Sequence, residues 1–259
     1  MHPVFFSFRG FSIYSYGVFV NLAFILSVLY LSYSQKRSND DVISQDKLHF
    51  LVITTMVFGI IGSRLLFVIM HFREFMLMPL SIFNLRQGGL VYYGGFITAA
   101  IFIMLYAKRN KIQILKLGDF FAPALAFGHA VGRVGCFFSG CCYGKESTFP
   151  WAVVFGNEQG VPLHPTQIYE CLCNLLLFVI LYFYSKKKRT PGKSLAVYLI
   201  FYSVSRFFIE FLRGDFRGEQ YLGLSTTQII SIVLFMIGIC IICKQKFMKN
   251  SKEKELTLI

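Results

Sequence analysis

The sequence predicts an all-α integral membrane protein, a bundle of seven transmembrane helices with its N-terminus outside and its C-terminus in the cytoplasm. Three observations lead to this prediction. Of the 259 residues, 55% are hydrophobic and only 15% are charged, whereas soluble proteins rarely exceed about half apolar composition. The apolar residues form long blocks rather than short alternating runs. Basic residues gather in every second loop.

Seven blocks are long enough to cross a bilayer, which takes about 20 mostly apolar residues. In chain order they cover residues 12–33, 50–71, 89–107, 119–139, 166–185, 194–213 and 225–243. The third and fourth contain several glycines, which membrane helices tolerate better than soluble ones. The first is too long for a removed signal peptide and lacks its cleavage site. We expect residues 1–243 to form one seven-span membrane domain, and 244–259 a basic cytoplasmic tail.

The net charge of +13 is concentrated in alternate loops. Of the 26 lysines and arginines, 17 lie in residues 34–49, 108–118, 186–193 and the tail from Lys244. The N-terminal arm and the three other loops together hold only six. By the positive-inside rule the basic loops face the cytoplasm. The charge is therefore a topology signal, and we expect no nucleic-acid partner.

Three arginines, Arg64, Arg133 and Arg206, fall inside predicted spans. The rise of a helix places each roughly 18–21 Å from the cytoplasmic face. Charges at this depth are costly and usually functional. Glu210 follows Arg206 by four residues and shares its helix face, but the other two arginines have no acidic residue within a turn.

Unpaired guanidinium groups in an apolar cavity favour an anion, and their donor fork matches phosphate oxygens. The commonest membrane-borne phosphate is a phospholipid head group. The pattern therefore predicts a lipid head-group site that opens toward the outer leaflet. For Arg64 a purely structural role is an equal alternative.

Several short motifs occur in order along almost the whole chain. They are Ser15-Tyr16-Gly17, Gly62-Ser63-Arg64-Leu65, Gly88-Gly89-Leu90-Val91-Tyr92-Tyr93-Gly94-Gly95, Asp119-Phe120-Phe121-Ala122-Pro123, Gly132-Arg133-x-Gly135…Gly144, His164-Pro165-Thr166-Gln167-Ile168-Tyr169-Glu170 and Tyr202-x3-Arg206-x3-Glu210-Phe211-x-Arg213. Their order and spacing resemble the phosphatidylglycerol–prolipoprotein diacylglyceryl transferase family.

The resemblance implies an enzyme that moves the diacylglyceryl group of phosphatidylglycerol onto the lipobox cysteine thiol of exported prolipoproteins. A thioether forms and glycerol phosphate leaves. The implied partners are phosphatidylglycerol, the prolipoprotein signal peptide with its lipobox cysteine, and the lipid bilayer. The implied location is the bacterial cytoplasmic (inner) membrane, and no cofactor is expected.

The resemblance also implies site residues, matched motif by motif. The expected catalytic residues are Arg133, Arg206, Glu210 and Tyr93. The expected substrate-binding residues are Arg64, Tyr16, Tyr202, Gly144, Cys136, Cys141 and Arg213.

The chain departs from the family pattern at the centre of this site. Tyr93 stands where most members have a histidine. Cys136, Ser139 and Cys141 stand where the signature has two asparagines and a glutamate. These changes keep two alternatives open: a relative that acts on another acceptor, and a non-catalytic membrane protein that binds phospholipid.

Five cysteines lie near the outward ends of the fourth and fifth spans, at positions 136, 141, 142, 171 and 173. Small packing residues are the favoured interpretation, and a disulfide is an alternative. A metal site with His129 or His164 added is a further alternative, but neither CxxC nor HxxxH spacing occurs there, and we predict no metal. His129 precedes Arg133 by four residues, so repulsion favours a neutral ring, either hydrogen-bonded in the core or accepting a thiol proton.

Overall fold

The computed structural model describes residues 2–8, 11–37, 42–84, 89–155, 160–185, 190–215 and 223–256. Almost all regular structure in this part of the chain is helical, as the sequence predicts. The chain divides into two compact units, each described by itself below. The first unit is Met1–Leu31 with Gly118–Ile259, and the second is Ser32–Leu117.

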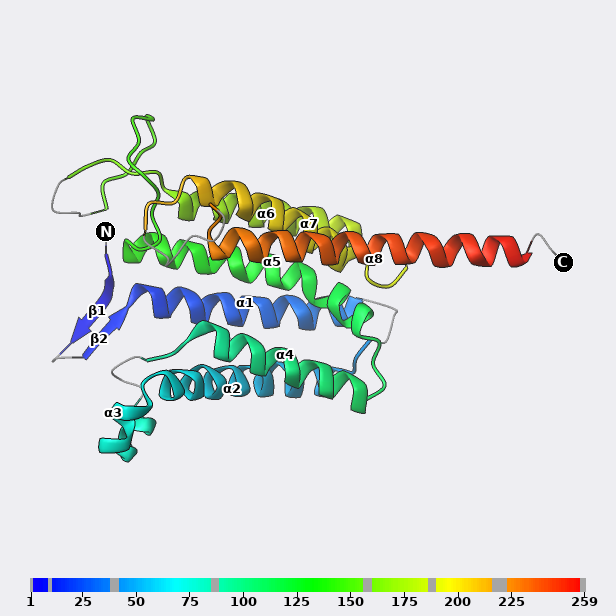
Figure 1. The fold of residues 1–259 in the computed structure, drawn as a ribbon, viewed down its shortest axis with the longest axis horizontal. Coiled ribbons are helices and arrows are strands. Elements are labelled where there is room, and N and C mark those ends of the chain that lie inside the picture. Colours follow the sequence, from blue (N-terminus) through cyan, green and yellow to red (C-terminus); the bar gives the residue numbers. More distant parts are fainter. Residues whose placement is uncertain are drawn as a thin grey trace. The chain divides into compact units, whose positions relative to one another are not determined.

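The elements of each unit are drawn in Figure 1. The first unit contains β1 (Val4–Phe8), β2 (Phe11–Tyr14), most of α1 (Ser15–Arg37), most of α5 (Ile114–Ser139), α6 (Thr166–Ser185), α7 (Lys193–Phe211) and α8 (Thr226–Leu256). The second unit contains α2 (Gln45–Met70), α3 (Phe72–Leu77), the 3-10 helix η1 (Pro79–Phe83) and α4 (Tyr92–Arg109).

A short β-hairpin precedes α1, which the sequence did not predict. β1 and β2 pair antiparallel, with Val4 opposite Tyr14 and Phe6 opposite Ile13. The backbone N–H of Ser15 donates to the carbonyl of Pro3 at 2.9 Å. The hairpin is thereby closed onto the first turn of α1.

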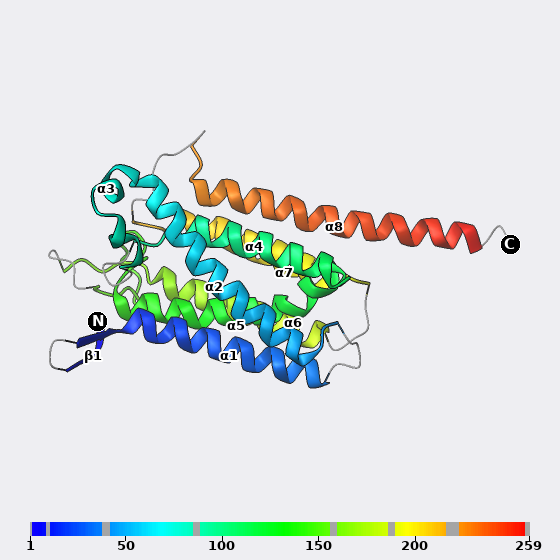
Figure 2. The same cartoon turned by 90° about the horizontal axis from the view of Figure 1, so that it is seen from below.

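The core of the first unit lies where α5, α6 and α7 pack together. Ala122 and Ala126 on α5 and Leu177 and Leu181 on α6 are fully buried, and aromatic residues of α7 pack against them. Small alanines let helix backbones approach closely, as is common between membrane helices. α8 runs along α7 (Figure 2), and its Gly238 faces the backbone and side chains of α7.

Asp119 on α5 ties this bundle to the start of α7. Its carboxylate oxygens accept hydrogen bonds from the backbone N–H groups of Gly192 at 2.6 Å and Leu195 at 2.8 Å. Gly192 has a φ of 95°, which favours glycine. Because the first N–H groups of a helix lack partners within it, an acceptor here stabilises the helix start.

In the second unit α2 and α4 lie side by side (Figure 1) and cross at glycines. A Cβ added to Gly62 would lie 2.6 Å from the carbonyl oxygen of Gly94, and one added to Gly94 would lie 2.3 Å from that of Gly62. Only glycine fits at both positions. This close approach explains why glycines recur in the third predicted span and its partner.

Each predicted span contains a helix, and in the part of the chain that the structure describes six helices are long and apolar enough to cross a membrane. They are α1, α2, α5, α6, α7 and the first part of α8. The shorter α4 is not among them, because tyrosines and glycines begin it and Lys108 and Arg109 end it. The six helices indicate a multi-pass membrane protein. Seven crossings stay a prediction.

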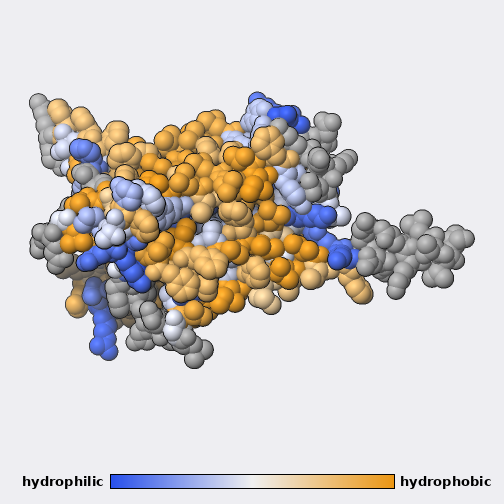
Figure 3. All heavy atoms as spheres, turned by 90° about the horizontal axis from the view of Figure 1, so that it is seen from above, coloured by the Kyte–Doolittle hydropathy of each residue, from blue (hydrophilic) through white to orange (hydrophobic). Residues whose placement is uncertain are grey.

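Exposed apolar side chains follow the helix period on the outer faces. On α6, Leu172, Leu176, Val179 and Phe183 form one exposed stripe. Much of the surface drawn in Figure 3 is hydrophobic. A surface of this kind requires a lipid environment.

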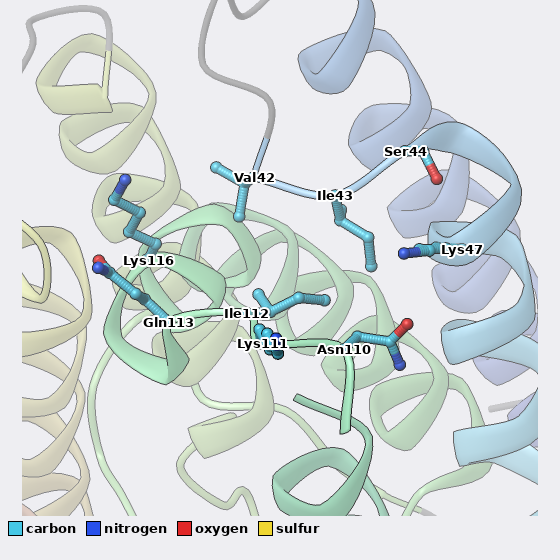
Figure 4. A pocket seen from close by; sticks show the side chains of 9 residues that line it. All are labelled: Val42, Ile43, Ser44, Lys47, Asn110, Lys111, Ile112, Gln113 and Lys116. Carbon is cyan, nitrogen blue, oxygen red and sulfur yellow. The ribbon is translucent and has the colours of Figure 1, made fainter. Parts of the chain in front are cut away.

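Loops that the sequence assigns to the same side of the membrane contact one another within each unit. In the second unit, residues of the first two basic loops line a hollow of about 380 Å³. Its three lysine side chains do not point toward a common point (Figure 4). In the first unit, the Gln245 side chain donates to the carbonyl of Pro191 at 2.7 Å. α8 continues to Leu256, so the predicted tail begins as a helix.

Candidate functional site

Glu170 on α6 is the centre of a buried group of ion pairs in the first unit. Its side chain is only 2% exposed. Its Oε2 lies 2.7 Å from Nη2 of Arg133 on α5, and its Oε1 lies 3.0 Å from Nη1 of Arg206 on α7. Oε1 also lies 3.4 Å from Nη1 of Arg213, directly after α7. One carboxylate therefore holds three guanidinium groups together.

Two further carboxylates complete this group. Glu210 pairs with Nη2 of Arg206 at 2.8 Å and accepts a hydrogen bond from the Ser225 hydroxyl at 3.0 Å. Asp215 accepts two hydrogen bonds from the fork of Arg213, at 2.8 and 2.7 Å. We call these residues the Glu170 cluster: Arg133, Glu170, Arg206, Glu210, Arg213 and Asp215. Its formal charges cancel, which is the condition under which buried charges are tolerated.

The expectation that Arg133 has no acidic partner is wrong. Spacing along one helix reveals only partners three or four residues away, and Glu170 belongs to a different helix. The expected pair of Arg206 and Glu210 is confirmed at 2.8 Å. Arg133 and Arg206 do converge, but on a shared carboxylate rather than as unpaired cations.

The cluster can stabilise negative charge that appears during a reaction. A guanidinium has five N–H donors, more than one carboxylate accepts, so each arginine can also donate to a bound phosphate. The ion pairs to Glu170 orient the guanidinium groups in advance. Donors that are already oriented in a water-poor site are usually the largest contribution to catalysis.

His129 lies one helical turn before Arg133 and contacts it directly. Nε of Arg133 donates to Nε2 of His129 at 3.1 Å. A ring nitrogen that accepts a hydrogen bond carries no proton, so the imidazole is neutral, as the sequence predicts. Because this nitrogen is engaged, His129 orients Arg133 rather than standing ready to accept a thiol proton.

Two tyrosines that the sequence assigns to the site also lie around Arg133. The ring of Tyr202 on α7 lies 5.3 Å from that of His129, and it stacks on Tyr198 at 5.8 Å. Tyr16, at the start of α1, interacts electrostatically with Arg133 and Cys136. Both tyrosines therefore border the Glu170 cluster.

The sulfur atoms of Cys136, Cys141 and Cys142 lie within 4.8 Å of one another. Cys136 belongs to α5, and the other two follow it in a turn. The Gln167 side chain donates to the carbonyl of Cys141 at 2.7 Å, and the Thr166 hydroxyl to that of Cys142 at 2.8 Å. The start of α6 thus fixes this turn beside the cluster.

Cys142 has two unusual properties. Its φ is 67°, a left-handed conformation that non-glycine residues rarely adopt. Hydrogen bonds from the Cys136 and Cys141 thiols, together with the Arg213 guanidinium, lower the pKa of the Cys142 thiol below its ordinary value. Among the described residues no disulfide is present. Because the three sulfur atoms lie so close together, these cysteines can do more than fill space in the core.

Gly144 brings the cysteine turn next to Arg213. The two residues form a β-bridge, and Lys145 N–H donates to the carbonyl of Leu212 at 2.8 Å. A Cβ on Gly144 would lie 2.6 Å from both the Leu212 oxygen and Cβ of His164. Glycine is required here for close approach, which is a physical basis for the role that the resemblance implies.

Arg64 belongs to the second unit and binds backbone carbonyls there. Its guanidinium donates to Ser81 at 2.7 Å, Ile82 at 2.8 Å, and Gly89 and Asn84 at 3.1 Å. Phe67 and Phe75 lie against it, with ring centres 5.5 and 5.3 Å away. These contacts favour the structural alternative, and the substrate-binding role stays a prediction.

Tyr93 also belongs to the second unit, in the first turn of α4, and is 49% exposed. Its catalytic role stays a prediction.

Sequence reasoning missed the central residue, Glu170, as a site residue. The signal was present, because an ionisable residue inside a predicted span is a functional candidate, and Glu170 ends one of the quoted motifs.

Comparison with known proteins gives a consistent result. A family model described as prolipoprotein diacylglyceryl transferase matches residues 3–244. A Clostridium perfringens protein named phosphatidylglycerol–prolipoprotein diacylglyceryl transferase 2 is 39% identical over 251 residues, covering 95% of this chain and 96% of the relative. Proteins with the unnumbered name from Clostridium tetani and Finegoldia magna are 37% and 34% identical, covering 96% and 95% of this chain, and 100% and 96% of the relatives.

Proposed function

Because the chain belongs to the prolipoprotein diacylglyceryl transferase family, we propose that it transfers the diacylglyceryl group of phosphatidylglycerol to prolipoproteins. The acceptor is the lipobox cysteine thiol, the new bond is a thioether, and glycerol phosphate leaves. The observation that carries this mechanism is the buried convergence of Arg133, Arg206 and Arg213 on Glu170.

In this proposal the arginines bind the phosphate of the lipid. The thiolate attacks the diacylglyceryl carbon, a C–S bond forms, and the C–O bond breaks with its electron pair moving to the phosphate oxygen. Arg133 and Arg206 stabilise that growing charge as catalytic residues. Glu210 orients Arg206 through the 2.8 Å ion pair, and Glu170 holds the arginines in one place.

The remaining site residues surround this centre or keep the roles that the resemblance assigns. Tyr16, Tyr202, Arg213, Cys136 and Cys141 border the substrate in the first unit. Gly144 permits the approach of Arg213. In the second unit, Tyr93 remains a catalytic candidate and Arg64 a substrate-binding one.

We further propose that residues 1–243 cross the bacterial inner membrane seven times and that residues 244–259 form a cytoplasmic tail. The seven crossings are the six long apolar helices and, as the third in chain order, α4. The alternation of basic loops supports an N-terminus outside and a C-terminus inside. The loop contacts agree, because the 140–165 loop contacts the segment after α7 and the tail contacts Pro191.

Mass spectrometry of a synthetic lipobox peptide, incubated with the purified protein and phosphatidylglycerol, tests the activity. The peptide should gain the mass of one diacylglyceryl group, and its Cys→Ser counterpart should gain none. Lipid binding without a mass gain would instead indicate a non-catalytic phospholipid-binding protein. A gain on the serine peptide would indicate another acceptor group.

A further inference from the structure

The three clustered thiols invite a role that the sequence did not predict. Cys136 is only 8% exposed, whereas Cys141 is exposed, so the group has a buried side and an open side. Its turn is held by Gln167 and Thr166, and its sulfur atoms already lie within 4.8 Å of one another. Little movement is needed for all three to contact one ion.

We propose that Cys136, Cys141 and Cys142 bind a thiophilic divalent cation of the zinc class, whose fourth position takes the acceptor cysteine thiol. The second part rests on the proposed transferase function. Zinc prefers thiolate ligands and four-coordinate tetrahedral geometry. Sites with three protein ligands keep the fourth position for water or substrate, as catalytic zinc sites do.

The two histidines that could add ligands to a metal site have other partners. Nε2 of His129 accepts a hydrogen bond from Arg133, and Nδ1 of His164 lies 3.1 Å from the hydroxyl of Tyr169. The three sulfur atoms therefore form the candidate ligand set without them. The sequence argument against a metal used residue spacing, and spacing could not show that these sulfurs meet.

The charges around the thiols suit a metal–thiolate centre. Three thiolates and one divalent cation carry a net negative charge. Both Arg213 and Arg133 interact electrostatically with Cys142, and Arg133 also with Cys136. Groups that contact metal ligands in this way tune and stabilise the site. Because Arg133 and Arg213 belong to the Glu170 cluster, a metal here would lie beside the arginines that bind the phosphate.

A disulfide explains this arrangement less well. It would join two of the sulfurs and leave the third without a role, and a bond between the adjacent Cys141 and Cys142 would be strained. It would also need an oxidant. Metal binding uses all three thiols and changes no oxidation state.

The metal would supply the nucleophile. The acceptor thiol releases its proton to solvent when its sulfur binds the metal, since a coordinated thiol is deprotonated. The bound sulfur then forms the C–S bond while the C–O bond breaks, and the electron pair goes to the phosphate of the departing glycerol phosphate. The thioether product is a weaker ligand than a thiolate and leaves the metal.

The first test is metal binding by the full chain, purified into lipid nanodiscs and titrated with Co²⁺ as a spectroscopic probe for Zn²⁺. We expect about one ion per chain with thiolate-to-cobalt absorption. Cys136→Ser and Cys142→Ser should each weaken binding by about tenfold or more. Cys240→Ser, at an exposed cysteine on α8, should bind as the wild type does. Absent thiolate bands, or unchanged binding in both cluster variants, would overturn the proposal.

The second test adds a lipobox peptide to the cobalt-loaded protein in nanodiscs that contain no phosphatidylglycerol. The cysteine peptide should shift the visible cobalt spectrum and the serine peptide should not. An unchanged spectrum would overturn the acceptor role. When phosphatidylglycerol is then supplied, diacylglyceryl transfer by metal-free protein would overturn the role of the metal in holding the acceptor thiol, while the transferase function stands. A spectral shift with the cysteine peptide, followed by no transfer once phosphatidylglycerol is added, would support the metal site and count against the transferase.

Discussion

Arg133 and Glu170 form an ion pair of 2.7 Å between α5 and α6, and the same carboxylate also binds Arg206 from α7. Three helices are thus joined by a single acidic side chain. The ion pair has two consequences, because Glu170 both neutralises buried positive charge and sets the positions of the guanidinium groups. Removal of the Glu170 carboxylate should therefore lower both the stability of the protein and its transferase activity.

Glu170→Gln should lower the free energy of unfolding by about 3–5 kcal/mol, since removing one partner leaves buried charge uncompensated. Transfer by the protein that remains folded should fall as well, because the arginines lose their common anchor. Thermal unfolding in detergent and the peptide mass assay measure the two effects. Glu74→Gln, at an exposed position on α3, is the matched control. Wild-type stability and activity in Glu170→Gln would contradict the anchoring role.

Gly144→Ala should separate the cysteine turn from Arg213. The new Cβ would lie 2.6 Å from the Leu212 oxygen, and overpacking of this kind costs about 1–3 kcal/mol. We expect a lower unfolding temperature and reduced transfer. For the stability measurement Gly132→Ala is the control, because a Cβ there meets nothing within 4 Å. Equal unfolding temperatures for the two variants would show that the contact at Gly144 is unimportant.

Single cysteines placed in a background lacking the seven native ones test the topology. A cysteine at Ser147, in the 140–165 loop, should react with an impermeant reagent in intact cells. A cysteine at Lys187 should react only after permeabilisation; the predicted inside segment Lys186–Arg189 lies outside the described residues. Permeabilised cells, in which both sites should react, control for accessibility. Labelling of Lys187→Cys in intact cells would reverse the orientation.

Much of the fold could be predicted because its signals are local. Apolar block length locates the six helices that are long and apolar enough to cross a membrane, and the shorter α4 as a helix. The i,i+4 spacing identifies the pair of Arg206 and Glu210. Helix rise predicts one depth for Arg64, Arg133 and Arg206, and the structure brings Arg133 and Arg206 together on Glu170. The shared depth of all three stays a prediction. The role of Glu170 depends on packing between helices that are distant in sequence, and no periodicity encodes that partner.

The cysteine turn shows the same limit at shorter range. Cys136 and Cys141 are five residues apart, across the end of α5. Their sulfurs meet because the chain turns there and because residues at the start of α6 bind the turn's carbonyls. The sequence identified these positions as departures from the family pattern, but only the fold shows that they lie together.

In the proposed mechanism the Glu170 cluster binds the phosphate that leaves during transfer. The most direct test is the single-turnover rate of peptide diacylglycerylation in Arg133→Gln, Arg133→Lys and the wild type, with Arg73→Gln as a control at an exposed arginine on α3. Loss of one such donor typically slows catalysis by about 100-fold or more. We predict this loss in Arg133→Gln and poor rescue by lysine, which cannot reproduce the bidentate fork. A wild-type rate in Arg133→Gln, at a normal level of folded protein, would contradict the claim.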